Sequence, residues 1–444
     1  MLKINKIKYL FVFALFIFPN LSQAQKLDVH TFTLENGLEV MVAENHKAPI
    51  AKMMLFYKVG AADEAPGKSG LAHLLEHLMF RGTTNISDSE FNDIMLKNGV
   101  DFNAFTTRDL TAYHALCDLS RLEVVLALEA DRMQNLKIDD NAFLAEQKIV
   151  YQERQQRIEN KPKARFAEDA NKILWQNTPY EHPVSGTLEE IKSLKKEDVQ
   201  RFYETYYVPS NAVLVIAGDV TAEEVKPMVQ KYFGGIKRGA PIERNFSFSV
   251  KEGGNYVMIK EMPDIEKASI SVSYIIPSVF ENRKHAYALY VFSGYLGQNG
   301  VYYLKRKLTN QHKVVAASSS VDIFNRGSGE FEIRVLPNEN SETPSDLNLI
   351  NQTLKNASSS FTPELLEKEK KQFLSWFVYI QDNPSDLAAF IGPLKAFGWS
   401  DHEIENYVSN IENVQFEDVQ EALKHMLSDS KRMVSVLLPK RKEQ

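Results

Sequence analysis

The sequence predicts an α+β protein of two similar domains, each a sheet with helices packed on one face. Three observations lead to this prediction: the length of the chain, the mixture of strand-like and helix-like segments, and a weak internal repeat. The 444 residues are enough for two to three domains. With 44% hydrophobic and 25% charged residues, the composition is that of a globular protein. The net charge is −6 and no long basic run occurs, so a nucleic-acid partner is not indicated.

The internal repeat relates two halves of about 200 residues each. Its clearest element is the tetrapeptide EDVQ at 197–200, which recurs at 417–420, an offset of 220. Two further segment pairs resemble each other at that offset or nearly so: 213–216 with 433–436, and 51–57 with 268–274. Repetition over most of the chain indicates two homologous domains.

The N-terminus has the layout of a secretory signal. Lysines precede an apolar run at 9–18, and Pro19 and the small-residue end 22–24 follow it. We expect cleavage after Ala24 and export to the periplasm of a Gram-negative bacterium, an uncleaved N-terminal anchor being the alternative. Cys117 is the only cysteine, so no disulfide can form within the chain. The expected domains are a signal peptide at 1–24, an N-terminal domain at 25–236, a linker at 237–254 and a C-terminal domain at 255–444.

The first half reads as strands and helices in alternation. Alternating residues around Asn36-Gly37 predict a hairpin. Two capping boxes, Ser87 with Glu90 and Ser120 with Glu123, predict the starts of two helices. The other predicted elements are a strand at 51–59, one or two strands at 101–117, and a helix at 141–160 that Asp139 or Asp140 caps and Pro162 ends.

The stretch from Gly70 to Gly82, GLAHLLEHLMFRG, carries the clearest chemical signal. His73 and His77 are four residues apart, so on an α-helix both imidazoles can reach one ion. Glu76 lies beside them, and the leucines would bury the helix. The order H-x-x-E-H is a zinc-peptidase signature in which the carboxylate is the general base. The alternative for each histidine is a hydrogen-bonded place in the core.

A zinc site needs at least a third protein ligand, because two histidines leave the ion under-coordinated. Glu146 and Glu153 are seven residues, two turns, apart on the predicted helix and therefore share a face. Either glutamate could be the ligand, and their spacing does not choose between them.

The H-x-x-E-H motif, followed by a helix with two glutamates, resembles the pitrilysin family of zinc metallopeptidases. That family includes insulin-degrading enzyme and the mitochondrial processing peptidase. The resemblance implies that His73, His77 and Glu153 bind one Zn²⁺. It also implies that Glu76 is the general base and that Glu146 orients a ligand histidine. The implied fold has the two domains facing each other across a cavity.

Three further segments are similar to the family: 70–83, 103–106 (NAFT) and 211–219 (NAVLVIAGD). The resemblance therefore covers nearly the whole mature chain. It implies that Asn103, Ala104 and Phe105 lie on an edge strand that binds the extended substrate by strand addition.

The second half has lost this chemistry. The stretch at 288–296, equivalent to the motif, has no histidine pair, and Asn406 breaks the pattern that begins at His402. Many relatives carry an arginine and, seven residues on, a tyrosine in this half, which donate hydrogen bonds to the substrate carbonyl. Our alignment places Thr309 and Ala316 there, and neither side chain can do this.

Some bacterial relatives divide the work between a zinc subunit and a second subunit with the arginine and tyrosine. The resemblance implies that this chain is the zinc subunit of such a pair and is weakly active alone. The expected function is zinc-dependent hydrolysis of peptides or unfolded polypeptides. The alternative is a non-catalytic assembly or peptide-holding subunit that retains zinc.

Overall fold

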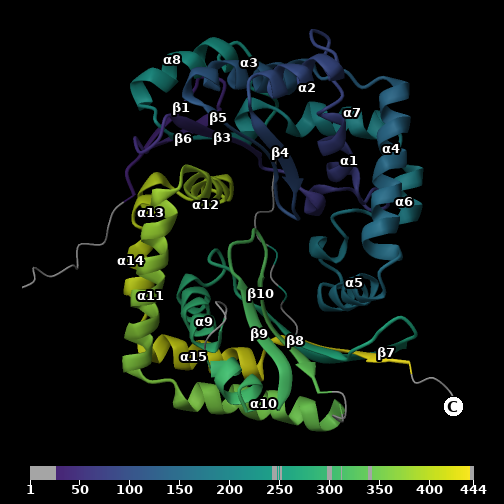
Figure 1. The fold of residues 1–444 in the computed structure, drawn as a ribbon, viewed down its shortest axis with the longest axis vertical. Coiled ribbons are helices and arrows are strands. Elements are labelled where there is room, and N and C mark those ends of the chain that lie inside the picture. Colours follow the sequence, from purple (N-terminus) through teal and green to yellow (C-terminus); the bar gives the residue numbers. More distant parts are fainter. Residues whose placement is uncertain are drawn as a thin grey trace, which may run out of the picture.

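Two sheets face each other across the middle of the molecule (Figure 1). The computed structural model describes residues 27–242, 248, 250, 253–297, 303–311, 313–338 and 343–440. The expected signal peptide at 1–24 lies outside the described residues. Among the helices that are described, none has both the length and the hydropathy that crossing a bilayer requires.

The first sheet has six strands within the described residues, in the spatial order β1-β2-β6-β3-β5-β4. β2 and β6 run parallel, and the other neighbouring pairs are antiparallel. The strands are β1 (Val29–Thr33), β2 (Glu39–Glu44), β3 (Ile50–Tyr57), β4 (Asp101–Thr106), β5 (Thr111–Asp118) and β6 (Ala212–Gly218). The helices of this half are η1 (Ala61–Asp63), α1 (Leu71–Leu78), α2 (Asp88–Lys97), η2 (Leu119–Arg121), α3 (Leu122–Asn135), α4 (Asp140–Arg154), η3 (Gln155–Glu159), α5 (Pro162–Leu174), η4 (Pro179–Glu181), α6 (Leu188–Ser193), α7 (Lys196–Tyr206), η5 (Pro209–Asn211) and α8 (Ala222–Phe233).

The second sheet has five strands within the described residues, in the order β7-β11-β8-β10-β9. β7 and β11 run parallel, and the other pairs are antiparallel. The strands are β7 (Gly254–Met262), β8 (Ser269–Ile276), β9 (Val314–Asp322), β10 (Gly329–Pro337) and β11 (Lys431–Pro439). The helices of this half are α9 (Arg283–Leu296), η6 (Lys305–Thr309), α10 (Thr343–Ser360), α11 (Pro363–Asp382), α12 (Pro384–Ala396), α13 (Asp401–Glu405), α14 (Tyr407–Glu412) and α15 (Phe416–Ser428).

The two sheets have the same topology once β1 is set aside, and this confirms the predicted α+β fold of two similar halves. The order β2-β6-β3-β5-β4 corresponds to β7-β11-β8-β10-β9, with the parallel pair in the same place. The repeated EDVQ tetrapeptide lies in the first turn of α7 and of α15. There Asp198 and Asp418 accept the main-chain N–H groups of Lys195 and Gln415, both at 3.0 Å. The repeat therefore includes a shared helix-capping geometry.

Most local predictions in the first half are confirmed. β1 and β2 form the hairpin, Ser87 and Glu90 cap α2 reciprocally, and Asp139 caps α4. The described residues between α8 and β7 form no helix or strand, as a linker would, but the domain boundaries themselves stay a prediction.

Two local predictions are wrong in detail. The capping box at Ser120 does not form, because Asp118 accepts the Ser120 N–H at 2.9 Å and caps the 3-10 turn η2. The side chain two residues upstream satisfies that amide first, so α3 begins only at Leu122. The helix after Asp139 does not run regularly to Pro162 either. It continues beyond α4 as the π-helical turn η3, and Pro162 is the first residue of α5.

One helix from each half packs on the inner face of the other half's sheet. α12 packs on β3 and β6 of the first sheet, and α5 packs on β11 and β7 of the second. Both helices begin with a proline and have 13 residues, at an offset of 222 from residue 162 to residue 384. The core around α12 is continuous with the core of the second half. Each sheet is thus partly closed by the other half, and a chamber remains between them.

Candidate metal centre and chamber

α1 carries the two motif histidines, and the chain enters this helix through Gly70. Gly70 has φ +88°, the left-handed region that favours glycine, and a Cβ there would lie 3.0 Å from the Cα of Gly186. The carboxylate of Glu64 accepts hydrogen bonds from the N–H groups of Gly70 at 3.0 Å and Ala72 at 2.7 Å. It satisfies main-chain donors that a helix leaves free at its N-terminus. These contacts fix the direction of α1.

Apolar packing brings α4 against α1. Phe143 and Val150 of α4 belong to the same core cluster as the leucines of α1, and the two helices are in direct contact. The buried leucines of α1 are Leu71, Leu74, Leu75 and Leu78. The packing turns Glu146 and Glu153 toward the histidines.

The three residues expected to bind zinc lie together. The Nε2 atom of His77 is 3.4 Å from Oε2 of Glu153, and Nε2 of His73 is 4.0 Å from the same oxygen. One possible ligand atom from each residue lies within 4.8 Å of the other two. Glu153 is therefore the glutamate that lies with the histidine pair. The spacing along the helix did not distinguish it from Glu146.

Glu146 lies behind His77. Its Oε2 atom accepts a hydrogen bond from Nδ1 of His77 at 2.9 Å, and Arg81 donates to its other oxygen. A proton on Nδ1 leaves the Nε2 lone pair for a metal. On the other side of the cluster, Arg157 forms an ion pair of 2.7 Å with Oε1 of Glu153. Both glutamates are thus oriented by an arginine.

The protonation of the cluster fits a divalent cation. Burial lowers the pKa of His73 to about 4, so this imidazole is neutral at pH 7. Burial also acts to lower the pKa of His77, but hydrogen bonds to Glu146 and Glu153 raise it to about 9. The carboxylates therefore favour a positive charge here, which a metal ion would supply in place of the proton. The Nδ1 atom of His73 is buried without a hydrogen-bond partner among the described residues, which disfavours a hydrogen-bonded core role.

Glu76, the expected base, is tied to the strand beside it. Thr106, the last residue of β4, donates a hydrogen bond of 2.6 Å to Oε2 of Glu76. Burial raises the pKa of Glu76, while the Thr106 hydrogen bond and the charge of His77 act to lower it. A carboxylate with a raised pKa is suited to accept a proton near neutral pH.

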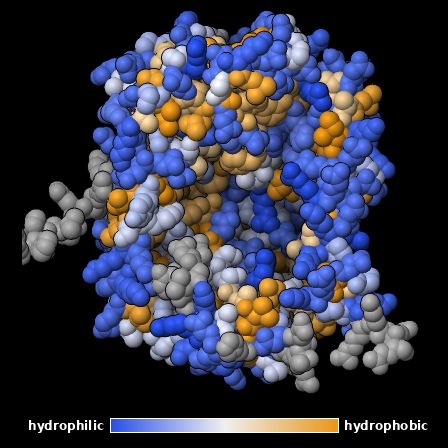
Figure 2. Space-filling view, viewed as in Figure 1, coloured by the Kyte–Doolittle hydropathy of each residue, from blue (hydrophilic) through white to orange (hydrophobic). Residues whose placement is uncertain are grey.

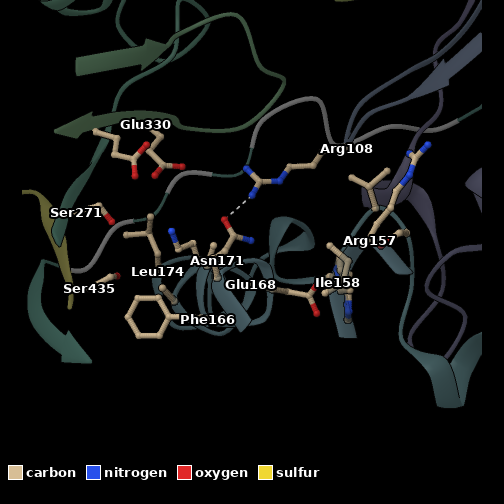
Figure 3. A pocket seen from close by; sticks show the side chains of 18 of the residues that line it. Arg108, Arg157, Ile158, Phe166, Glu168, Asn171, Leu174, Ser271, Glu330 and Ser435 are labelled. Carbon is tan, nitrogen blue, oxygen red and sulfur yellow. Dashed lines mark hydrogen bonds between the residues drawn. The ribbon is translucent and has the colours of Figure 1, made fainter. Parts of the chain in front are cut away.

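A chamber of about 1160 Å³ contains the cluster. Figure 2 shows a hollow in the middle of the molecule, with hydrophilic residues in its depth. Ser271, Glu330 and Ser435 of the second sheet lie across the chamber from Arg108 and Arg157 (Figure 3). The polar residues of the second-half wall are Ser269, Ser271, Ser273, Glu330, Glu332, Arg334 and Ser435.

β4 forms the chamber edge of the first sheet. Within the described residues it pairs only with β5, so its other side offers main-chain groups to an extended chain. Asn103, Ala104 and Phe105, predicted to bind substrate, lie on this strand and line the chamber. Phe105 is 38% exposed, so its ring is available for contact with a bound peptide.

The turn after β4 is held by α5 and the segment that follows it. Arg108 donates a hydrogen bond of 2.6 Å to Asn171 of α5, drawn as the dashed line in Figure 3. Its guanidinium carbon lies 5.2 Å from the ring centroid of Trp175 and 5.0 Å from that of Tyr180. These cation–π contacts restrain the end of the expected substrate strand.

The second half has no arginine or tyrosine at the two aligned positions. Thr309 is the last residue of η6, and Ala316 lies in β9. Ala316 is paired with Leu336, which lines the chamber. Because directly paired residues of neighbouring strands share a face, a methyl group lies on the chamber side where the resemblance calls for a tyrosine.

Four site residues were not found from the sequence: Glu64, Thr106, Arg108 and Arg157. Thr106 and Arg108 contact side chains 30 and 63 positions away, and Glu64 accepts main-chain N–H groups six and eight residues on, so no spacing between side chains marks them. Arg157 alone had a local signal, since it follows Glu153 by four residues and so shares its helix face.

Two family profiles match the chain. Residues 39–188 match the insulinase family, peptidase family M16, and residues 193–373 match the peptidase M16 inactive domain. The first range contains all of the cluster and β4, and the second contains most of the half without the motif.

Named relatives are similar over part of their length. The zinc protease PqqE of Helicobacter pylori is 28% identical over 291 residues, which are 65% of each chain. A probable mitochondrial-processing peptidase subunit beta of Arabidopsis thaliana is 30% identical over 201 residues, 45% of this chain and 38% of that protein. The chain thus spans less than two thirds of these relatives.

Solved structures share the fold. A protease from Helicobacter pylori superimposes with a TM-score of 0.84 at 23% identity, covering 93% of this chain and 99% of that one. The first half of the periplasmic protease PqqL from Escherichia coli gives a TM-score of 0.77 at 17% identity, covering 94% and 93% of the two chains. Since both profiles and the overall fold agree with the H-x-x-E-H motif, the chain belongs to peptidase family M16, the pitrilysin or insulinase family.

Proposed function

We propose that the protein is a zinc-dependent endopeptidase that hydrolyses peptides or unfolded polypeptides. The observation that supports this best is the cluster of His73, His77 and Glu153, with Glu76 beside it, open to a chamber with an edge strand. A family member of similar sequence is named a zinc protease.

His73 and His77 would hold one Zn²⁺ through Nε2, and Glu153 through Oε2. Zinc, when bound, lowers the pKa of a coordinated water toward neutrality and polarises the scissile carbonyl. Glu146 keeps the His77 ring in the coordinating orientation through the hydrogen bond at Nδ1.

Glu76 takes the proton of the attacking water and passes it to the leaving amine. The hydrogen bond from Thr106 to Oε2 of Glu76 fixes the orientation of this carboxylate. The raised pKa of Glu76 favours the first of these steps, because a more basic carboxylate accepts a proton more readily.

The substrate would bind as an added strand along β4, beside Asn103, Ala104 and Phe105. Strand addition uses main-chain hydrogen bonds, so it gives affinity without requiring one sequence. A chamber of about 1160 Å³ is somewhat larger than typical ligand pockets and suits an extended segment, which favours peptides and unfolded chains.

The chain would be the zinc-bearing subunit of a two-subunit enzyme. A homologous partner would contribute the arginine and tyrosine that Thr309 and Ala316 replace here. Relatives that are named subunits of a processing peptidase support this arrangement. The signal-like residues 1–24 and the likeness to a periplasmic protease support export to the periplasm.

The test compares the wild type with Glu76→Gln for zinc content, peptide binding and cleavage of a fluorogenic peptide. Each protein is assayed with and without its co-purified homologous partner. We expect one zinc per chain in both, similar peptide binding, and turnover reduced about 10²- to 10⁴-fold in the variant. Glu189→Gln, an exposed substitution on α6, serves as the matched control.

The second candidate is a peptide-holding or assembly subunit that retains zinc, and the missing arginine and tyrosine favour it. Zinc and peptide binding without turnover, in the wild type with its partner present, would support this candidate. Turnover that survives Glu76→Gln would exclude the proposed mechanism.

A further inference from the structure

One side chain of the second half, Arg326, reaches into the first half beside the catalytic elements. It lies in the turn between β9 and β10 and is only 7% exposed. Its guanidinium donates two hydrogen bonds of 2.8 Å to the two oxygens of Asp63 and one of 3.0 Å to Asp109. Its main-chain N–H also donates to Asp109 at 3.1 Å. Both aspartates belong to the first half, so a buried charge-assisted network joins the halves.

Asp63 connects Arg326 to the segment that leads into α1. Asp63 is the last residue of η1, and the next residue, Glu64, accepts the N–H groups at the start of α1. Oδ2 of Asp63 also accepts the N–H of Gly60 at 2.9 Å. A Cβ on Gly60 would lie 2.5 Å from the carbonyl oxygen of Thr107, so η1 and the turn after β4 touch without spare room.

Asp109 connects Arg326 to the turn that ends β4. Tyr180 donates a hydrogen bond to Asp109 and accepts the N–H of Gly327 at 3.0 Å. The ring of Tyr180 is fully buried. Arg326 therefore binds the Asp109 carboxylate directly, and Gly327 is linked to the same carboxylate through the Tyr180 hydroxyl.

Main-chain hydrogen bonds complete the path to the expected base. The N–H of Ala61 donates to the carbonyl of Thr107 at 3.0 Å, and that of Ala62 to the carbonyl of Arg108 at 2.7 Å. Thr106, one residue before this turn, donates to Glu76. The start of α1, the end of β4 and the base therefore meet around one network.

We propose that Arg326 is a positioning residue, which holds β4 and the start of α1 in one relative placement so that Glu76 and the bound peptide meet at the metal centre. The second half then helps to position the active-site elements as well as enclosing the chamber. This inference rests on the proposed function for its catalytic consequence, but its binding consequence depends only on β4.

Burial makes the arginine hard to replace. The side chains of Arg326, Asp63 and Asp109 are 8%, 11% and 4% exposed. Without the guanidinium, two buried carboxylates would face each other with no cation between them. They would separate or admit water, and either response moves the turn after β4 relative to η1. A shift of about 1 Å between reacting groups costs about a hundredfold in rate.

The test measures kcat/KM with a fluorogenic peptide for the wild type, Arg326→Gln, Arg326→Lys and the control Lys395→Gln. It also measures the affinity for the same peptide of each variant combined with Glu76→Gln. Lys395 likewise joins the halves, through Glu39 of β2 at 3.2 Å, but β2 lies toward the opposite edge of the sheet from β4.

We expect Arg326→Gln to lower kcat/KM about a hundredfold. We expect it to weaken peptide binding about tenfold, the worth of one or two hydrogen bonds, with zinc content unchanged. Arg326→Lys should recover part of the kcat/KM and part of the peptide affinity. Lysine restores the charge but lacks the planar guanidinium that can bridge two carboxylates. Lys395→Gln should stay within about threefold of the wild type, since distant sites act independently.

Tyr180→Phe is the milder second variant if Arg326→Gln does not fold. It removes only the hydroxyl between Asp109 and Gly327, and we expect the same pattern with a smaller loss, about threefold to tenfold. Equal kcat/KM and equal peptide affinity in the folded network variants and in Lys395→Gln would overturn the inference. Absence of cleavage in every protein, with the homologous partner present and the difference in peptide affinity preserved, would overturn the endopeptidase proposal and support the positioning role.

Discussion

At His77, two carboxylates act on one imidazole. Glu146 lies 2.9 Å from Nδ1, and Glu153 lies 3.4 Å from Nε2. The two glutamates share a helix face, yet one orients the ring and the other shares the proposed ion with it. A third contact, from Thr106 to Glu76, orients the expected base. Single side-chain contacts therefore distinguish the proposed roles of chemically identical carboxylates.

Glu146→Gln should weaken zinc binding about 10- to 100-fold, because a neutral amide holds the His77 Nδ1 proton less strongly than a carboxylate does. Competition with a chromophoric chelator measures this. Asp140→Asn, in the first turn of the same helix and exposed, is the control and should leave the affinity unchanged. Equal affinity in both variants would show that Glu146 does not support the ligand.

Thr106→Val should move the acid limb of the pH–rate profile to higher pH. The hydroxyl stabilises the charged form of Glu76, so its removal raises the pKa of a carboxyl that burial has already raised. Glu76 must be deprotonated to act, and activity therefore declines at a higher pH as the solution is acidified. Thr106→Ser keeps the hydroxyl and should restore the profile of the wild type. A valine profile that coincides with it would contradict the assignment.

Among the elements, α4 and α11 show what the second half has kept and lost. Glu146 and Glu369 are each the seventh residue of their helix. Glu369 is 5% exposed and faces α9, where a Cβ on Gly294 would lie 3.2 Å from its Oε2 atom. Burial raises its pKa to about 6. The helix has kept the buried carboxyl, while the facing helix offers a glycine where α1 offers a histidine.

Glu369→Gln should stabilise the protein at pH 7.5 and have less effect at pH 5. The pKa of Glu369 rises from 4.5 to about 6 on folding, so the folded state binds more protons between these values. Stability therefore falls as the pH rises through this window, by about 2 kcal/mol in all. Urea unfolding at the two pH values measures the difference. Glu417→Gln, an exposed substitution on α15, should show none, and a gain independent of pH would refute the explanation.

At the scale of the whole molecule, the reciprocal packing of α5 and α12 makes the two halves depend on each other. Gly392 of α12 lies where a Cβ would be 2.1 Å from Cε2 of Phe56 in β3. Only a residue without a side chain lets helix and strand approach this closely. The contact covers the inner face of the first sheet at β3 and β6.

Gly392→Ala should reduce the free energy of unfolding by about 1–3 kcal/mol, because the added methyl group overpacks a rigid contact between the halves. Gly235→Ala is the control, since nothing lies within 4 Å of its added Cβ. Chemical unfolding followed by tryptophan fluorescence measures both. Equal stabilities would mean that α12 can move away from β3 at little cost.

Local patterns predicted those parts that depend on short intervals. The spacing of His73 and His77 and the capping box of α2 each involve residues within about one helical turn. The hairpin of β1 and β2 likewise depends on a short turn between neighbouring strands. The prediction at Ser120 failed because Asp118 competes for the same amide, and two caps of similar strength cannot be ranked from spacing alone.

The sequence by itself determined the α+β fold of two similar halves and the helix that carries His73, Glu76 and His77. These follow from repeated segments and from helix periodicity, which short-range geometry sets. Only the tertiary structure decided that Glu153 approaches the histidines while Glu146 lies behind them, and that Arg326 reaches Asp63 across 263 positions of the chain. Such contacts depend on how elements pack in space. The separation of two residues along the chain does not give the distance between their side chains once packing brings them together.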